Sequence, residues 1–456
     1  MERREFLKDA ALGTAALVST TTSALRIIGA NDRVNLGLVG AGGRGQLLMK
    51  VAAAIPNVEF TGVSDLYPPQ VRAAQQVAGP RCRGFNDFRK LLDQKDLDAV
   101  LIATPDHWHS IPTILACQAG KDVYVEKPFA YSIKEGRAMV DAALQNRRVV
   151  QVGTQHRSAP HFREVERIIQ SGQLGPIHFV RVWNYLNLSP DGLGRTPDSN
   201  PPPGLDWDFY LGPAPAVPFN QNRFLRTYRW FWDYAGGMTT DYGNHRFDTV
   251  HQVMHADHPI AVMGWGRRYQ LNDGADVPDA LQVTYEYSGF ILSYEASMLN
   301  GHGVGAQGVG RRYYGARGPD DRPHGIAFYG TNGTLLADRI GFELYPEPKG
   351  SSLPGVGSKS SNAEGWRTER VEATDEDATG LHMKNFIDCV RSREKPVAHA
   401  EIGHGSTIVP HLGNISIRTG HKLRWDATKE QIVDDPEAST LLFRQPRKPW
   451  DEILRA

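Results

Sequence analysis

Residues 34–45 read Val-Asn-Leu-Gly-Leu-Val-Gly-Ala-Gly-Gly-Arg-Gly, an apolar run that breaks into the pattern G-x-G-x-x-G at Gly40, Gly42 and Gly45. This order predicts a strand, a tight turn and a helix whose first turn points free backbone N–H groups at a pyrophosphate. Gly40 permits the turn, Gly42 lets the backbone approach the phosphates, and Gly45 lets the helix pack against the strand. The stretch therefore predicts a dinucleotide-binding site.

The residues around this glycine pattern indicate which dinucleotide is bound. Asp65 closes the next apolar run, 58–64, where a carboxylate that binds the ribose is expected. Asp65 should accept hydrogen bonds from a free 2′-hydroxyl, which favours NAD. Gly43 and Arg44 belong to the same predicted phosphate-binding loop, and an arginine there could pair with a 2′-phosphate, so NADP remains possible.

Alternating strands and helices extend the pattern to about residue 153. This alternation is typical of a parallel, doubly wound sheet. We expect the strands at 34–39, 58–64, 99–103, 122–125 and 149–152, and the helices at 45–55, 69–77, 108–119 and 133–145.

The second part of the chain has a different pattern of predicted strands and helices. Strand-like runs at 177–185, 261–266, 280–287 and 290–297 follow one another without intervening helices, as in an open, largely antiparallel sheet. Two long loops rich in proline and glycine and two late helices, 379–393 and 404–418, complete it. We therefore predict an α/β protein with a Rossmann dinucleotide-binding domain at 31–153 and a substrate-binding α/β domain at 154–456, whose final helices have the option of packing back on the first domain.

The first thirty residues form a region of their own. Arg3 and Arg4, followed by Phe6, Leu7 and Lys8, resemble a twin-arginine export signal. The stretch 10–25 is too short and too polar to span a bilayer stably. We expect export by the twin-arginine machinery to the periplasm or the medium, with cleavage after residue 24 or residue 30. The alternative is a basic, frayed N-terminus.

Composition excludes some classes of partner. The chain of 456 residues has 51 Lys plus Arg and 51 Asp plus Glu, so no net field favours nucleic acid or an anionic membrane. Its three cysteines, Cys82, Cys117 and Cys389, are widely spaced and odd in number. They fit neither a disulfide framework nor a zinc site, and we expect buried thiols.

Two motifs fall at the predicted carboxyl edge of the parallel sheet, where ligands bind in such folds. Residues 123–129, Val-Tyr-Val-Glu-Lys-Pro-Phe, place Lys127 beside Glu126 and before a proline. An ammonium there can lie near a nicotinamide and a substrate hydroxyl. Residues 103–109, Ala-Thr-Pro-Asp-His-Trp-His, end the preceding strand. Their histidines and aspartate match no spacing typical of a zinc site, so no metal is expected.

A third motif supplies a candidate base. Asp241 and His245 stand at i and i+4, which places them one above the other on a helix face. A carboxylate one turn from an imidazole can orient it and raise its basicity, as general-base chemistry requires. Just upstream, the aromatic stretch 228–234 suits either stacking on sugar rings or a plug in the core, and the sequence favours neither.

Together these motifs resemble the glucose–fructose oxidoreductase/inositol dehydrogenase (Gfo/Idh/MocA) family over nearly the whole chain after the signal. The resemblance implies a nicotinamide cofactor between two domains, a homo-oligomer, and Lys127, Asp241 and His245 as catalytic residues. By the same resemblance, the residues that line the dinucleotide are Thr104, Pro105, His109, Glu126 and Lys127. The export signal and the Pro/Gly-rich loops are features that the simplest cytosolic members of this family lack.

We therefore expect hydride transfer between a nicotinamide and a hydroxyl-bearing carbon of a sugar, polyol or glycoside. In this hypothesis His245 takes the proton, Asp241 orients His245, and Lys127 stabilises the reacting oxygen. One alternative is a redox-neutral glycosidase, which oxidises the sugar, eliminates the aglycone, adds water and returns the hydride. Another is a protein that only binds a nucleotide or carbohydrate.

Overall fold

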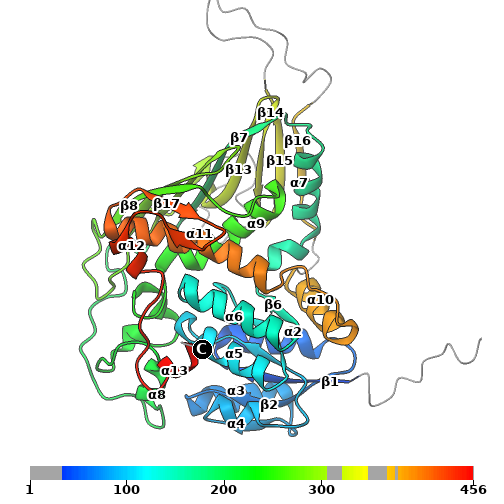
Figure 1. The fold of residues 1–456 in the computed structure, drawn as a ribbon, viewed down its shortest axis with the longest axis vertical. Helices are drawn as coiled ribbons and strands as arrows, with labels where there is room; N and C mark the ends of the chain where they lie inside the picture. Colours follow the sequence, from blue (N-terminus) through cyan, green and yellow to red (C-terminus); the bar gives the residue numbers. More distant parts are fainter. Residues whose placement is uncertain (1–32, 306–320, 348–366, 375–377, 455–456) are drawn as a thin grey trace, which may run out of the picture.

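The computed structural model describes residues 33–305, 321–347, 367–374 and 378–454. The expected export signal lies outside the described residues. Two bodies stack along the long axis of the molecule, with the parallel sheet and its helices below and a broad sheet above (Figure 1).

The lower body is built on a six-stranded parallel sheet in the order β3-β2-β1-β4-β5-β6, so the strand order reverses between β1 and β4. Its strands are β1 (Val34–Val39), β2 (Val58–Ser64), β3 (Arg83–Phe85), β4 (Ala99–Ile102), β5 (Asp122–Val125) and β6 (Val150–Val152). Its helices are α2 (Gly43–Ala53), α3 (Pro68–Ala78), α4 (Phe88–Leu92), α5 (Ser110–Gln118) and α6 (Ile133–Gln145). The predicted doubly wound sheet is confirmed, and β3 and α4 were not predicted.

The upper body contains a sheet of ten strands in the order β16-β15-β14-β13-β7-β10-β9-β8-β17-β18. Neighbouring strands pair antiparallel except β7 and β10, which are parallel. The strands are β7 (Ile177–Tyr185), β8 (Ala261–Arg267), β9 (Ala280–Glu286), β10 (Ile291–Ser297), β13 (His324–Gly330), β14 (Gly333–Asp338), β15 (Gly341–Pro346), β16 (Glu369–Glu372), β17 (Leu423–Asp426) and β18 (Gln431–Ile432). The open, largely antiparallel sheet is confirmed, and it is wider than the four predicted strands.

Helices cover the face of this sheet that is turned toward the parallel sheet. They are α7 (Pro160–Gln170), α9 (Asn244–Met254) and α11 (Ala400–Thr419) (Figure 1). Buried side chains from these helices and from the strands form one continuous apolar core, which includes Phe162, Phe247, Leu292 and Leu412. This core fixes α9, the helix that carries His245, above the carboxyl edge of the parallel sheet.

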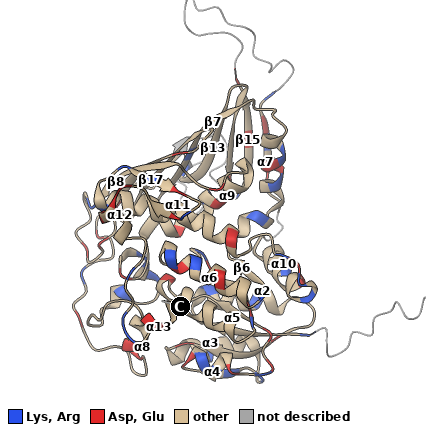
Figure 2. Cartoon of the chain, in the orientation of Figure 1, with Lys and Arg blue, Asp and Glu red and all other residues tan. Residues whose placement is uncertain are grey.

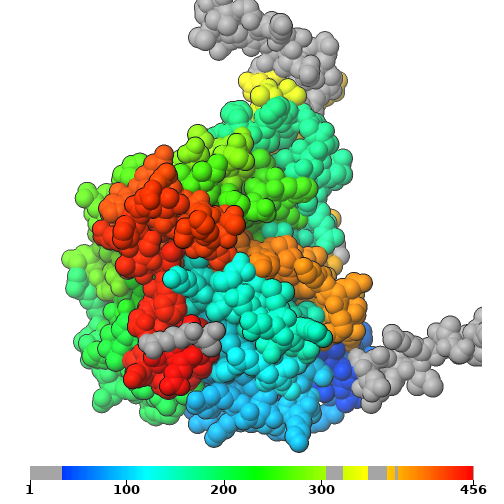
Figure 3. Space-filling model, viewed as in Figure 1, coloured from blue at the N-terminus to red at the C-terminus, as the bar shows by residue number. Residues whose placement is uncertain are grey.

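Late segments of the chain return to the Rossmann sheet. Met383, Phe386 and Ile387 of α10 (Ala378–Ser392) share an apolar cluster with Leu36 of β1 and Met49 of α2. The short helix α13 (Asp451–Leu454) packs against α5, and its cluster also holds the side chains of strands β4 and β5. In Figure 3, α10 in orange lies directly against the cyan and blue residues. The Rossmann core is therefore completed by the C-terminal part of the sequence.

Acidic and basic residues are interspersed along the elements of both bodies (Figure 2). All three cysteines are buried as free thiols, as expected. Among the described residues, no helix is long and apolar enough to cross a membrane.

Candidate active site

The glycine-rich turn has the geometry that phosphate binding needs. Gly40 has φ +87°, and a Cβ there would lie 2.7 Å from the backbone of Ala103 and Thr104. A Cβ on Gly45 would lie 2.1 Å from the carbonyl oxygen of Gly40, so α2 can pack on β1 only with glycine here. A Cβ on Gly42 or Gly43 would meet no atom within 4 Å. The loop is thus closed toward the sheet and open toward the cleft.

Asp65 and Arg44 are both engaged by neighbours. The N–H groups of Ala41 and Tyr67 donate to the two oxygens of Asp65 at 2.7 and 2.8 Å. Burial raises the pKa of the Asp65 carboxyl, against the effect of these N–H groups. Arg44 donates through Nε to Oε1 of Glu126 at 2.7 Å. The Nε of Arg44 is therefore held at the end of β5.

Lys127 is held by a residue that lies 114 positions away in the sequence. Its Nζ donates to Oδ1 of Asp241 at 2.5 Å and to the carbonyl oxygen of Asp241 at 2.7 Å. Arg229 Nε lies 3.2 Å from the same Oδ1. Burial opposes charge on Asp241, but Lys127 and Arg229 outweigh it and hold the pKa of the carboxyl well below its usual range. Asp241 is therefore a fixed anion shared by two cations.

His245 does not have the partner that the sequence predicted. Its Nδ1 has no hydrogen-bond partner among the described residues, and the Asp241 carboxylate is directed at Lys127 and Arg229 instead. A π-helical turn over Thr239–Gly243 precedes α9, so the two residues do not share a regular α-helical face. The predicted orientation of His245 by Asp241 is wrong.

A second imidazole lies beside His245. The rings of His156 and His245 are stacked, with centroids 5.2 Å apart and an interplanar angle of 28°. Arg339 Nε donates to Nε2 of His156 at 3.2 Å, so the ring proton is on Nδ1, 3.0 Å from Oγ1 of Thr249. Burial, with a contribution from Arg339, lowers the pKa of both imidazoles well below the ordinary value. Both rings are neutral at neutral pH.

The other residues expected to line the dinucleotide lie at the carboxyl ends of β4 and β5. His109 places Nδ1 2.6 Å from the carbonyl oxygen of Pro128 and Nε2 3.1 Å from that of Thr104, and thereby ties the two loops together. Thr104, Pro105, His109, Glu126 and Lys127 all line the cleft that the glycine turn opens into. The structure thus brings the predicted cofactor residues into one wall.

The aromatic stretch at 228–234 divides between the two predicted roles. Phe231 and Tyr234 are buried in the upper core, whereas Tyr228 and Trp230 belong to that core and also line the cleft. The Tyr228 hydroxyl donates to Oδ1 of buried Asp106 at 3.0 Å. The next residue, His107, has its ring Nε2 3.0 Å from the carbonyl oxygen of Tyr210. Among the described residues, no group of His, Cys, Asp or Glu side chains is arranged to hold a metal ion.

One cleft of about 1250 Å³ lies between the two bodies. The glycine turn and Asp65 line one end, and Lys127, Asp241 and His245 line the other. Sequence reasoning missed Arg229, His156, His161 and Arg339, which also line the second end. Of these residues, only Arg229 could have been identified from the sequence, because it lies inside the aromatic stretch 228–234.

Comparisons with known proteins agree with this geometry. The Gfo/Idh/MocA model described as "Oxidoreductase family, NAD-binding Rossmann fold" matches residues 34–154, and the companion model of the "C-terminal alpha/beta domain" matches residues 160–293 and 365–452. Inositol 2-dehydrogenase of Salmonella typhimurium is 29% identical over 167 residues, which are 36% of this chain and 48% of that protein. Levoglucosan dehydrogenase of Pseudarthrobacter phenanthrenivorans is 31% identical over 169 residues, 35% of this chain and 43% of that protein.

The alignments span about half the length of the relatives that the chain matches. A solved structure, levoglucosan dehydrogenase in complex with NADH, superposes with a TM-score of 0.62 at 18% identity, covering 86% of this chain and 98% of that chain. At this identity the likeness establishes the fold.

Proposed function

The chain belongs to the Gfo/Idh/MocA oxidoreductase family, and on that premise we propose that it transfers a hydride between NAD and a hydroxyl-bearing carbon of a sugar, polyol or glycoside. The observation that carries the proposal is the convergence of Lys127, Asp241 and a neutral His245 at one end of a cleft whose other end is the open glycine turn. Relatives named inositol 2-dehydrogenase and levoglucosan dehydrogenase support a polyhydroxylated substrate.

The residues present fit NAD. Gly42 and Gly43 leave open space above the turn, and the first turn of α2 has no side chain capping its N–H groups, which are therefore free for a pyrophosphate. Asp65 keeps lone pairs for ribose hydroxyls after it accepts two backbone hydrogen bonds. When bound, NAD supplies the hydride acceptor at the nicotinamide ring.

The protein residues supply the proton chemistry. The neutral imidazole of His245 lines the cleft and can accept the hydroxyl proton of the substrate through a ring nitrogen. Two N–H bonds of the Lys127 ammonium are directed at Asp241, and the third is available to the reacting oxygen. Asp241 therefore acts by holding Lys127 in position rather than by orienting His245.

Following reduced nicotinamide by absorbance tests the proposal. Purified protein and NAD are mixed with a panel of polyols, free sugars and glycosides. We expect NADH to accumulate with at least one of them, and Lys127→Met to abolish the signal while NAD still binds. Absence of hydride transfer across the panel, with NAD bound, would refute the proposal.

A second candidate, the redox-neutral glycosidase, is favoured by a further base in the cleft. His161 Nε2 lies 3.0 Å from the carbonyl oxygen of Asp338, which can only accept, so the ring proton is on Nε2 and Nδ1 keeps its lone pair. Elimination of an aglycone requires a base that removes the proton beside the new ketone. Release of aglycone without net NADH would favour this candidate, and one NADH per sugar consumed would favour the plain oxidoreductase.

We also propose export by the twin-arginine machinery, supported by Arg3 and Arg4 and by the residues that follow them. This route carries folded proteins, which suits a protein that must acquire its nucleotide in the cytoplasm. Changing both arginines to lysine should retain the precursor in the cytoplasm. Periplasmic accumulation of the double variant would contradict the export proposal.

A further inference from the structure

The described residues at the substrate end of the cleft carry more positive than negative charge. Lys127, Arg229 and Arg339 line it, with Arg226 nearby. Of the described carboxylates in the cleft, Asp65 lies at the glycine turn, Glu126 is paired with Arg44, and Asp241 contacts Lys127 and Arg229. Lys127 and Arg229 share Asp241, which offsets one of their two charges. Negative charge that develops on the reacting oxygen offsets the other. Among the described residues, no carboxylate forms an ion pair with Arg339.

Carboxylates near Arg339 are committed to other cations. Asp338, the preceding residue, is fully buried and forms an ion pair with Arg322 at 2.8 Å, and Glu343 lies 3.6 Å from the same guanidinium. Asp248 of α9 accepts from Arg157 at 2.9 Å. None of these acids forms an ion pair with Arg339 in the described part of the chain.

Arg339 is placed to contact a substrate close to the reacting carbon. Its Nε donates a hydrogen bond to His156, and this leaves the two terminal nitrogens of the guanidinium for another acceptor. His156 stacks on His245, so one imidazole ring separates Arg339 from the candidate base. An anion bound to Arg339 would thus belong to the same sugar ring as the oxidised hydroxyl.

We propose that the substrate is an acidic sugar, a uronic acid or its glycoside, whose ring carboxylate binds Arg339. The inference rests on the proposed function and specifies the substrate class of the same site. A carboxylate suits the planar guanidinium fork, which binds two oxygens side by side. The positive field of Lys127 and Arg339, which contributes to the lowered pKa of His245, is favourable for such an anion.

Matched pairs of sugars test the proposal: the methyl glycosides of glucuronic acid and glucose, galacturonic acid and galactose, and mannuronic acid and mannose. We expect kcat/KM for one acid to exceed that of its neutral partner by about 10- to 100-fold, the range for a hydrogen bond between charged groups. Arg339→Gln should remove this preference, because it should lower kcat/KM for the acid by a similar factor more than kcat/KM for the neutral sugar. Arg339→Lys should keep part of the preference.

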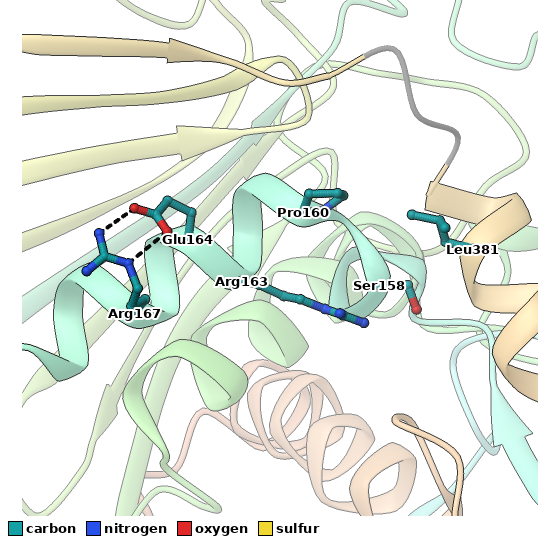
Figure 4. A pocket seen from close by; sticks show the side chains of 6 residues that line it. All are labelled: Ser158, Pro160, Arg163, Glu164, Arg167 and Leu381. Atoms are coloured by element: carbon teal, nitrogen blue, oxygen red, sulfur yellow. Dashed lines mark hydrogen bonds and ion pairs between the residues drawn. The ribbon is translucent and has the colours of Figure 1, made fainter.

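Arg163 provides the matched control. It is an exposed arginine of α7 in a separate small pocket, beside Ser158, Leu381 and the Glu164–Arg167 pair (Figure 4). Arg163→Gln removes the same charge outside the cleft and should leave the acid preference intact. Calorimetric titration of each acid into the protein with bound nucleotide gives a second readout, in which Arg339→Gln should weaken binding.

The outcomes separate the inference from the function on which it rests. Equal or faster turnover of the neutral sugars, with hydride transfer intact, would overturn the acidic substrate and leave the oxidoreductase standing. An acid preference that survives Arg339→Gln would overturn the role of Arg339. Absence of hydride transfer from every sugar would overturn both.

Discussion

Replacing His245 should separate chemistry from cofactor binding. Loss of a general base costs about 10²–10⁴ in rate, which corresponds to about 2.7–5.5 kcal/mol in the barrier. His245→Phe keeps a ring stacked on His156, whereas His245→Ala removes that contact as well. We expect both variants to lose turnover in this range, because neither provides an imidazole that can accept the proton.

NAD affinity should stay within about twofold of the wild type in both variants, because the described contacts of His245 are to His156 and Thr249 and not to the glycine turn. Turnover is measured by absorbance of NADH and affinity by nucleotide fluorescence. Burial and the cations Lys127 and Arg339 lower the pKa of His245, so kcat/KM should not fall as pH drops through about 6.5, the ordinary imidazole value. Collapse of NAD binding, or retention of more than a tenth of the activity, would refute the assignment of His245 as base.

Three further outcomes are expected. Asp65→Ser should weaken NAD more than NADP, and an unchanged ratio of the two dissociation constants would show that Asp65 does not discriminate between them. Asp241→Asn leaves Lys127 and Arg229 without their shared anion and should lower the free energy of unfolding in urea by about 3 kcal/mol, whereas Asp257→Asn, at an exposed position, should change it by less than about 0.5 kcal/mol. Burial lowers the pKa of His107 to about 3 and of His382 to about 4, below the unfolded value of about 6.5. The free energy of unfolding should therefore be unaffected by these two histidines above pH 6.5 and should decrease as the pH falls below it, because the unfolded chain then binds protons that the folded protein does not. Each histidine should lower the free energy of unfolding by up to about 1.4 kcal/mol per pH unit below 6.5. Urea unfolding midpoints at pH 7.5 and 5.5 measure this loss, and an unchanged midpoint would contradict the prediction.

The parallel sheet could be predicted because its signals are local. The glycine turn requires φ > 0 at Gly40 and close packing at Gly45, and only glycine satisfies both. By contrast, β3 has three residues, Arg83–Phe85, which are exposed or half-buried and form no apolar run. Short polar edge strands form through pairing with a neighbour, here β2, and a periodicity search does not detect them.

The candidate site could be predicted as a set of residues but not as a set of contacts. Lys127 and Asp241 were identified separately, and their bond joins positions 114 apart through the packing of two bodies. The i,i+4 rule assumed a regular α-helix at 241–245, and the π-helical turn invalidated it. Arg229, His156 and Arg339 come from three different segments, and only tertiary structure brings them to one cleft.

The return of α10 to the Rossmann sheet sets an order of events during synthesis. A ribosome finishes β1 and α2 early, but Met383, Phe386 and Ile387, which cover them, leave the exit tunnel more than three hundred residues later. Until then the nascent chain exposes an apolar face that chaperones bind. We therefore expect the Rossmann core to be complete only after nearly the whole chain has been translated.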